Sequence, residues 1–170
     1  RPLRVFYLQA EVQYHYLRER VKAIKLPAHR IPEARVNFVA TPQLRLLLND
    51  AGLAQVIPAM AQAFGGEAPD VIAIDPIRNV FDGGEGSAGE NDNAAMLFFL
   101  SQRVERLRDA VNPDAGIVLV HHTKKLGKRQ FEEDPFQALS GASSLRGYYS
   151  TGMLLFRADE TQSPRQVLFE

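Results

Sequence analysis

Apolar positions are grouped along the chain in short runs separated by longer stretches of mixed residues. Six runs have the apolar, aromatic or β-branched composition typical of strands: residues 5–8, 36–39, 71–74, 116–120, 153–156 and 166–169. The runs at 71–74 and 116–120 contain no polar residue, which is typical of strands buried on both faces of a parallel sheet. These two runs therefore predict the centre of such a sheet.

Between the runs, apolar residues recur every three or four positions, which is the spacing of amphipathic helices. This spacing predicts helices over 14–24 and 53–64, the second ending at Gly65-Gly66. The clearest helix has apolar residues at Met96, Leu97, Leu100, Val104, Leu107 and Val111. Its solvated face is expected to carry Arg103, Arg106 and Arg108. The glycine-rich segment 82–93 predicts a mobile loop whose last residues cap this helix.

The alternation of strands and helices predicts one α/β domain over residues 1–170, with a central sheet that is mostly parallel and flanked by helices. Ligands of such sheets bind at the carboxyl ends of the strands. The first polar residues after three of the predicted strands are Glu11, Asp75 and the pair His121-His122. We expect these side chains to meet at one edge of the sheet, with one histidine of the pair facing it.

Composition and charge narrow the class of protein. The chain is 45% hydrophobic and 24% charged, as in a soluble globular domain. Its 20 basic and 20 acidic side chains cancel, so any contact with nucleic acid requires a local basic patch. The absence of cysteine excludes disulfides and thiolate metal sites and is consistent with a reducing cytosol. Because no apolar run approaches ~20 residues and no signal peptide opens the chain, we expect a cytoplasmic protein without membrane contact.

An aspartate at the end of a hydrophobic strand is the residue with which nucleotide hydrolases hold the hydration shell of Mg²⁺. Asp75 occupies this position. Taken alone the pattern is weak, because aspartate also favours turns after strands. A second interpretation joins Asp75 to His121 and His122 as a zinc or iron site of a metal-dependent hydrolase.

Five segments together are more specific. In chain order they are VFYLQAE at 5–11, VIAIDPIRNVF at 71–81, END at 90–92, IVLVHHTKK at 117–125 and GASSLRG at 141–147. In this order and spacing the chain resembles the RecA-like P-loop ATPase family, most closely the branch of RepA-type hexameric helicases of plasmids and related phage and mobile-element ATPases. The resemblance implies a RecA-like sheet, ATP and Mg²⁺ as cofactors, and a homo-oligomer such as a hexameric ring acting on single-stranded DNA in replication or recombination.

The resemblance also implies roles for single residues. Asp75 matches the Walker B aspartate that positions Mg²⁺, and Glu11 matches the glutamate that orients and deprotonates the attacking water. His122 matches the polar residue that contacts the γ-phosphate. Arg157 is at the position of an arginine finger that reaches a neighbouring subunit, with Arg146 as the competing candidate for contact with the nucleotide.

A basic segment follows His122. Its cations are expected to contact the phosphates of single-stranded DNA: Lys124, Lys125, Lys128 and Arg129. The alternative is an ordinary solvated loop, because three acidic residues at 132–134 dilute the charge.

One motif of the family is missing. No G-x-x-x-x-G-K-[ST] phosphate-binding loop occurs in the sequence. In the family this loop lies just before the strand that begins here near Leu3, so the resemblance implies that an N-terminal strand, P-loop and helix precede these residues. We therefore expect ATP hydrolysis by the full-length protein and little by these 170 residues alone. The alternative is a catalytically degenerate scaffold or regulatory binding module.

Overall fold

Four of the predicted strands form one parallel sheet in the computed structural model, which describes residues 1–86, 89–124, 128–139, 143–157 and 165–170. The strand order is β2–β1–β3–β4. The bounds are Val5–Gln9 for β1, Phe38–Ala40 for β2, Val71–Asp75 for β3 and Gly116–Leu119 for β4. The α/β class and the parallel sheet flanked by helices, which the sequence predicts, are confirmed.

The register aligns the carboxyl ends of the strands. Gln9 lies opposite Asp75 in the pairing of β1 with β3, and Ile74 lies opposite Leu119 in the pairing of β3 with β4. The segments that follow β1, β3 and β4 therefore leave the sheet at the same edge.

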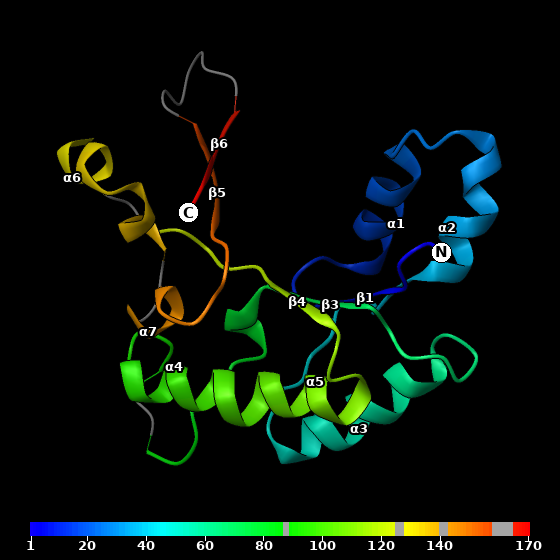
Figure 1. Cartoon of the computed structure of the whole chain (residues 1–170), viewed down its shortest axis with the longest axis horizontal. Helices are drawn as coiled ribbons and strands as arrows, with labels where there is room; N and C mark the ends of the chain where they lie inside the picture. The colour runs from blue at the N-terminus through cyan, green and yellow to red at the C-terminus, as the bar shows by residue number, and fades with distance from the viewer. Residues whose placement is uncertain (87–88, 125–127, 140–142, 158–164) are drawn as a thin grey trace.

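One face of the sheet is fully covered. Its residues Phe6, Leu8, Ile72 and Ile74 are at most 3% exposed. They belong to a core shared with α3 (Asp50–Gln62) and with a long helix made of α4 (Asn93–Phe99), a π-helical turn (Leu100–Val104) and α5 (Glu105–Val111). Figure 1 shows these helices together on one side of the sheet.

The long helix begins as the sequence predicts. The Asp92 carboxylate accepts a hydrogen bond of 2.8 Å from the backbone N–H of Ala95, which is the geometry of an N-terminal cap. The apolar stripe is buried at Met96, Leu100, Val104 and Leu107, each at most 1% exposed.

The opposite face of the sheet is open. Val118 in β4 is 49% exposed and Val120 just beyond it is 38% exposed, while Val71 and Ala73 in β3 are half-buried. The prediction that the apolar runs are buried on both faces is therefore wrong for this chain. The reason is that α1 (Tyr14–Ala23), a 3₁₀ turn (Ala28–Arg30) and α2 (Ile31–Asn37), which project on this side in Figure 1, bury none of their own residues and cover little of the sheet.

The predicted strand at 36–39 begins later than expected. Val36 lies in α2, and β2 starts only at Phe38. Pro32 occupies the first turn of α2, where a missing N–H costs no hydrogen bond. The helix therefore extends to Asn37.

Arg103 does not lie on the solvated face predicted for it. Its side chain is 11% exposed; Nε donates to Asp82 at 2.7 Å and Nη1 lies 3.3 Å from Asp50, with the guanidinium 4.9 Å from the centre of the Phe98 ring. Arg103 is three residues after Leu100 and four before Leu107, so the helical period places it on the same face as the buried apolar stripe. Arg106, beyond the turn, is 58% exposed, as predicted.

The C-terminal strands form a separate hairpin. β5 (Met153–Arg157) pairs antiparallel with β6 (Arg165–Phe169) and with no strand of the central sheet in the described part of the chain. The segment between β4 and β5 contains three short helical elements: α6 (Lys128–Glu133), a 3₁₀ turn (Pro135–Ala138) and α7 (Ser143–Arg146). Across the described ranges, no helix has the length and hydrophobicity needed to cross a bilayer.

Candidate functional site

Backbone hydrogen bonds continue past the ends of the strands and organise the carboxyl edge of the sheet. The N–H of Ala10 donates to the carbonyl of Asp75 at 2.8 Å, and the N–H of Val120 donates to the carbonyl of Ile74 at 2.9 Å. The chain is thereby held in register up to the residues just before Glu11 and His122. The structure places Glu11, Asp75 and His122 at the ends of three adjacent strands, as expected from the sequence.

Two of these side chains approach each other directly. Nε2 of His122 lies 3.7 Å from Oε2 of Glu11, and the two side chains are 51% and 53% exposed. This distance is longer than a hydrogen bond, and the two groups form an ion pair only when the imidazole is protonated. Both remain accessible to a ligand from solvent.

The position of Glu11 is fixed by a neighbour that the sequence analysis missed. Gln9 is only 1% exposed, and its Oε1 accepts from the N–H groups of Glu11 at 2.9 Å and Val12 at 2.5 Å, while its Nε2 donates to the Val12 carbonyl at 2.6 Å. Asn79 adds a bond of 3.0 Å to the carbonyl of Ala10. The sequence signal for this role was the single amide side chain of Gln9, directly after the apolar run at 5–8.

Asp75 has one direct side-chain partner on the open face. Tyr7 in β1 pairs with Ala73, which is two residues before Asp75 in β3. The Tyr7 hydroxyl donates a hydrogen bond to Oδ2 of Asp75. Burial, followed by this hydrogen bond and the charge of Asp75, raises the pKa of Tyr7 well above its ordinary value. The charge of Arg20 lowers the same pKa and that of Glu11 raises it, so both act on the Tyr7 hydroxyl. Neither Tyr7 nor Arg20 was predicted, because both contacts depend on the cross-strand register and the position of α1.

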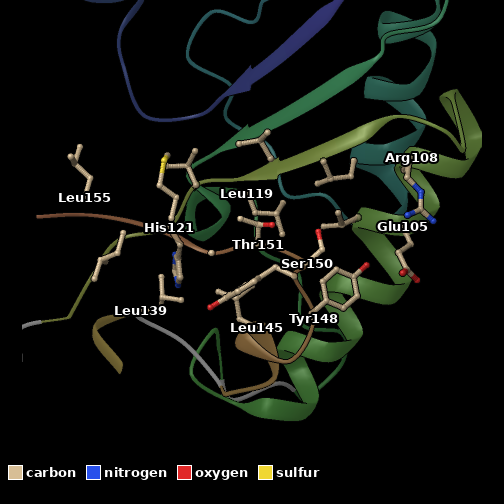
Figure 2. Close-up of a pocket in the computed structure, with 18 of the residues that line it drawn as sticks. Glu105, Arg108, Leu119, His121, Leu139, Leu145, Tyr148, Ser150, Thr151 and Leu155 are labelled. Atoms are coloured by element: carbon tan, nitrogen blue, oxygen red, sulfur yellow. The ribbon is translucent and has the colours of Figure 1, made fainter. Parts of the chain in front are cut away.

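The two histidines point to different places. His122 lies toward Glu11, whereas both ring nitrogens of His121 are buried and the ring lines a trough on the other side of β4 (Figure 2). The prediction that one histidine faces the carboxyl edge is confirmed, and the histidine is His122.

The trough runs between β4 and β5 and has a volume of about 650 Å³. Figure 2 shows Leu119, Leu139, Leu145 and Leu155 around it, with Glu105 and Arg108 at one end. Within the described residues β4 pairs only with β3, so its other edge, with backbone groups available for pairing, faces this trough. The lining does not include Glu11, Asp75 or His122, and its apolar character suits a further strand better than a triphosphate.

The two candidate arginines lie in the C-terminal part of the chain. Arg146 is bound within its own chain: Nη1 is 2.6 Å from Asp134, Nε donates to Glu170 at 2.9 Å, and a second bond reaches Glu170. These bonds, first to Glu170 and then to Asp134, raise the pKa of Arg146. Arg157 is exposed at the end of β5, opposite Arg165. Both assignments stay predictions, because an arginine finger acts on a neighbouring subunit.

The predicted DNA-contacting loop is described only in part. Lys124 is exposed and its N–H donates to the Ala138 carbonyl at 2.7 Å. Arg129 is 91% exposed, with Nε 2.8 Å from Glu133. Lys125 and the side chain of Lys128 lie outside the described residues. The role of this segment stays a prediction.

The edge fits part of what a nucleotide and its metal require. Asp75 supplies one carboxylate in a half-buried position, which suits Mg²⁺ because this ion keeps several of its waters. Over the part of the chain that the structure describes, no three His, Asp or Glu side chains gather as a closed metal site. The P-loop that would hold the phosphates is not in the sequence.

A parallel sheet with a carboxylate at the end of a central strand and a second one on the adjacent strand is an α/β arrangement that nucleotide-binding modules use. A family model described as AAA domain matches residues 1–128. The chain belongs to this family, whose P-loop ATPases bind nucleotide, usually with Mg²⁺. The matched segment contains Glu11, Asp75 and His122 but neither Arg146 nor Arg157. No curated protein matches the chain.

Proposed function

We propose that this chain is the motor domain of an ATPase that acts on DNA in replication or recombination, in the branch that resembles RepA-type ring helicases. The observation that carries the proposal is the convergence of Glu11, Asp75 and His122 at one edge of the sheet, with Glu11 and His122 3.7 Å apart. This arrangement offers a metal ligand, a base and a phosphate contact side by side.

Each residue has a separate task in this proposal. Asp75 holds the hydration shell of Mg²⁺, which when bound neutralises charge on the phosphates. Glu11 orients the attacking water and accepts its proton, and the Gln9 side chain holds the Glu11 turn in place. His122 contacts the terminal phosphate from the neighbouring strand. Because His122 also lies 3.7 Å from Glu11, its contact with the terminal phosphate is linked to the position of the base.

The phosphate cradle has to come from outside these 170 residues, since the sequence contains no P-loop. The unpaired edge of β4 supports this view, because a further parallel strand can pair there and deliver a loop to the carboxyl edge beside Asp75 and His122. In a homo-oligomer such as a hexameric ring, Arg157 then supplies the arginine finger. Arg146 is the second choice, since Asp134 and Glu170 already bind it.

The test is the ATPase activity of the native-length protein with Mg²⁺, with and without single-stranded DNA. We expect Asp75→Asn and Glu11→Gln each to lower kcat by about 100-fold or more. Asp114→Asn, a change at an exposed aspartate on the opposite edge, is the matched control and should retain full activity. Unchanged turnover in both site variants refutes the site.

The alternative is a catalytically degenerate scaffold or regulatory binding module, which a native-length protein without a P-loop would favour. Retention of labelled nucleotide by a native-length protein with no measurable turnover would support the scaffold over the motor.

A further inference from the structure

The segment from residue 14 to residue 37, here called the α1–α2 arm, carries an excess of basic over acidic residues. It contains two acidic residues, Glu19 and Glu33, and six basic ones: Arg18, Arg20, Lys22, Lys25, Arg30 and Arg35. This is a surplus of four positive charges in a chain whose formal net charge is zero. The arm therefore has a local surplus of positive charge, which the sequence analysis did not single out.

The structure leaves these charges accessible. No residue of α1 or α2 is buried, and all six cations are exposed. The two carboxylates pair locally, Glu19 with Lys22 at 3.0 Å and Glu33 with Arg30 at 2.8 Å. Four cations of the arm make no ion pair within the described residues: Arg18, Arg20, Lys25 and Arg35. Their charge is available to an anionic partner.

Aromatic rings accompany the charge. Tyr14 is 63% exposed and Tyr16 is 59% exposed, with the ring of His15 3.9 Å from that of Tyr16. Tyr14, Arg18 and Lys22 are four residues apart in sequence, so they follow one another along the same face of α1. Exposed rings beside cations are the two elements with which proteins bind single strands, since every base has a face that can stack and every linkage carries a charge.

We propose that the α1–α2 arm binds single-stranded nucleic acid, with the unpaired cations on the phosphates and Tyr14 and Tyr16 stacked on bases. A paired duplex hides the faces of its bases, so the exposed rings favour a single strand. The proposal rests on the nucleic-acid part of the proposed function and not on ATP hydrolysis. Because α1 begins three residues after Glu11, a bound strand would lie beside the candidate site.

A second copy of the chain is a weaker candidate for this surface. The arm does expose apolar side chains, among them Val21, Ile24 and Val36. However, a two-fold symmetric contact would bring two arms together, each with a surplus of four positive charges, and like charges repel at short range. In the head-to-tail contact of a ring, the arm would instead need an acidic surface on the neighbouring subunit. A polyanion is the partner whose charge complements the arm.

The experiment measures fluorescence anisotropy of labelled oligo-dT and oligo-rU with the native-length protein, without nucleotide, over a series of salt concentrations. The triple variant Arg18→Gln, Lys25→Gln, Arg35→Gln removes three phosphate contacts. We expect its affinity to fall about tenfold or more and its slope of log K against log salt to become shallower by about 2, at ~0.7 per phosphate. The matched control removes three exposed cations elsewhere, with Arg45→Gln, Arg106→Gln and Arg165→Gln, and should leave the slope unchanged.

The rings are tested separately. Tyr14→Ala with Tyr16→Ala should weaken binding about tenfold with an unchanged salt slope, because stacking involves no counterion, and the corresponding Phe variants should restore it.

Equal behaviour of the charge variant and its control overturns the proposal. The proposal is also overturned if the charge variant changes its oligomeric mass in light scattering but keeps its affinity for the oligonucleotides. That result would assign the arm to a subunit contact. Asp75→Asn separates the two functions, since it should abolish turnover and keep binding.

Discussion

The two faces of the central sheet differ sharply although the same strands build both. On the covered face, Ile72 and Ile74 are fully buried beneath α3 and the long helix. On the open face, the alternate positions of the same strands carry Tyr7, Asp75 and the exposed Val118. One face therefore provides the stability of the domain, and the other holds the polar side chains of the candidate site.

This division has a physical basis in strand geometry. Successive side chains of a strand point to opposite faces, so a strand can place apolar residues in a core and polar ones in a site without any change of backbone. The open face and the carboxyl edge together gather the charged groups Arg20, Glu11 and Asp75 around the Tyr7 hydroxyl. The binding residues are thus positioned by strands whose opposite face forms the core.

The largest expected effect tests the difference between the faces directly. Ile72→Ala on the covered face should lower the free energy of unfolding by about 2–5 kcal/mol, since it removes a fully buried side chain and leaves a cavity. Val118→Ala on the open face, where the side chain is 49% exposed, should cost under about 1 kcal/mol. Urea denaturation monitored by circular dichroism measures both. Equal losses would show that something covers the open face in solution.

The next effect concerns the ion pairs that join the long helix to the loop after β3 and to α3. Arg103→Met should lower the free energy of unfolding by about 3 kcal/mol, because it leaves the carboxylate of Asp82, itself 18% exposed, without its partner. Arg106→Met is the matched control: this arginine also bonds Asp50, but it is 58% exposed, and its loss should change stability by about 0.5 kcal/mol or less. Similar losses for the two variants would contradict the burial of Arg103.

Much of the covered face could be predicted from the sequence, and little of the open face could. The long helix and the strands β1, β3 and β4 were found because their apolar periodicity directly reflects burial. The same patterns could not show that one face of β4 is exposed, because apolar composition records which residues can be buried and not which helices cover them. Arg103 was misplaced because its charge was taken as a sign of exposure, although its spacing from Leu100 and Leu107 puts it on the buried face.

At the candidate site, the residues at strand ends were predictable and their supports were not. Glu11, Asp75 and His122 each follow an apolar run, and parallel strands bring such positions to one edge. Gln9 and Tyr7 lie within β1. Their roles depend on their hydrogen-bond partners, which are Glu11 in the following turn and Asp75 on the neighbouring strand, and the sequence does not show these contacts. The basic α1–α2 arm was overlooked because the overall charge is zero and its cations are spread over a helix, a turn and a second helix.

A smaller effect is expected at Tyr7. Tyr7→Phe should lower the free energy of unfolding at neutral pH by about 1 kcal/mol, through loss of the hydrogen bond to Asp75. Because the folded protein raises the pKa of Tyr7, the unfolded chain ionises first as the pH rises above about 10, and the contribution is lost there. The stability difference between wild type and variant should therefore shrink above pH 10 in urea titrations. A difference that grows instead would contradict the raised pKa.

The smallest effect is expected in the segment after β4, where Lys124 precedes α6 and Arg129 lies within it. Lys124→Ala with Arg129→Ala should change the free energy of unfolding by about 0.5 kcal/mol or less, because both side chains are exposed and the pair of Arg129 with Glu133 is solvated. If this loop contacts DNA as predicted, the same variant makes the slope of log K against log salt shallower by about 1.4, at ~0.7 for each phosphate. An unchanged slope, with the slope of the arm variant reduced, would assign strand binding to the α1–α2 arm alone.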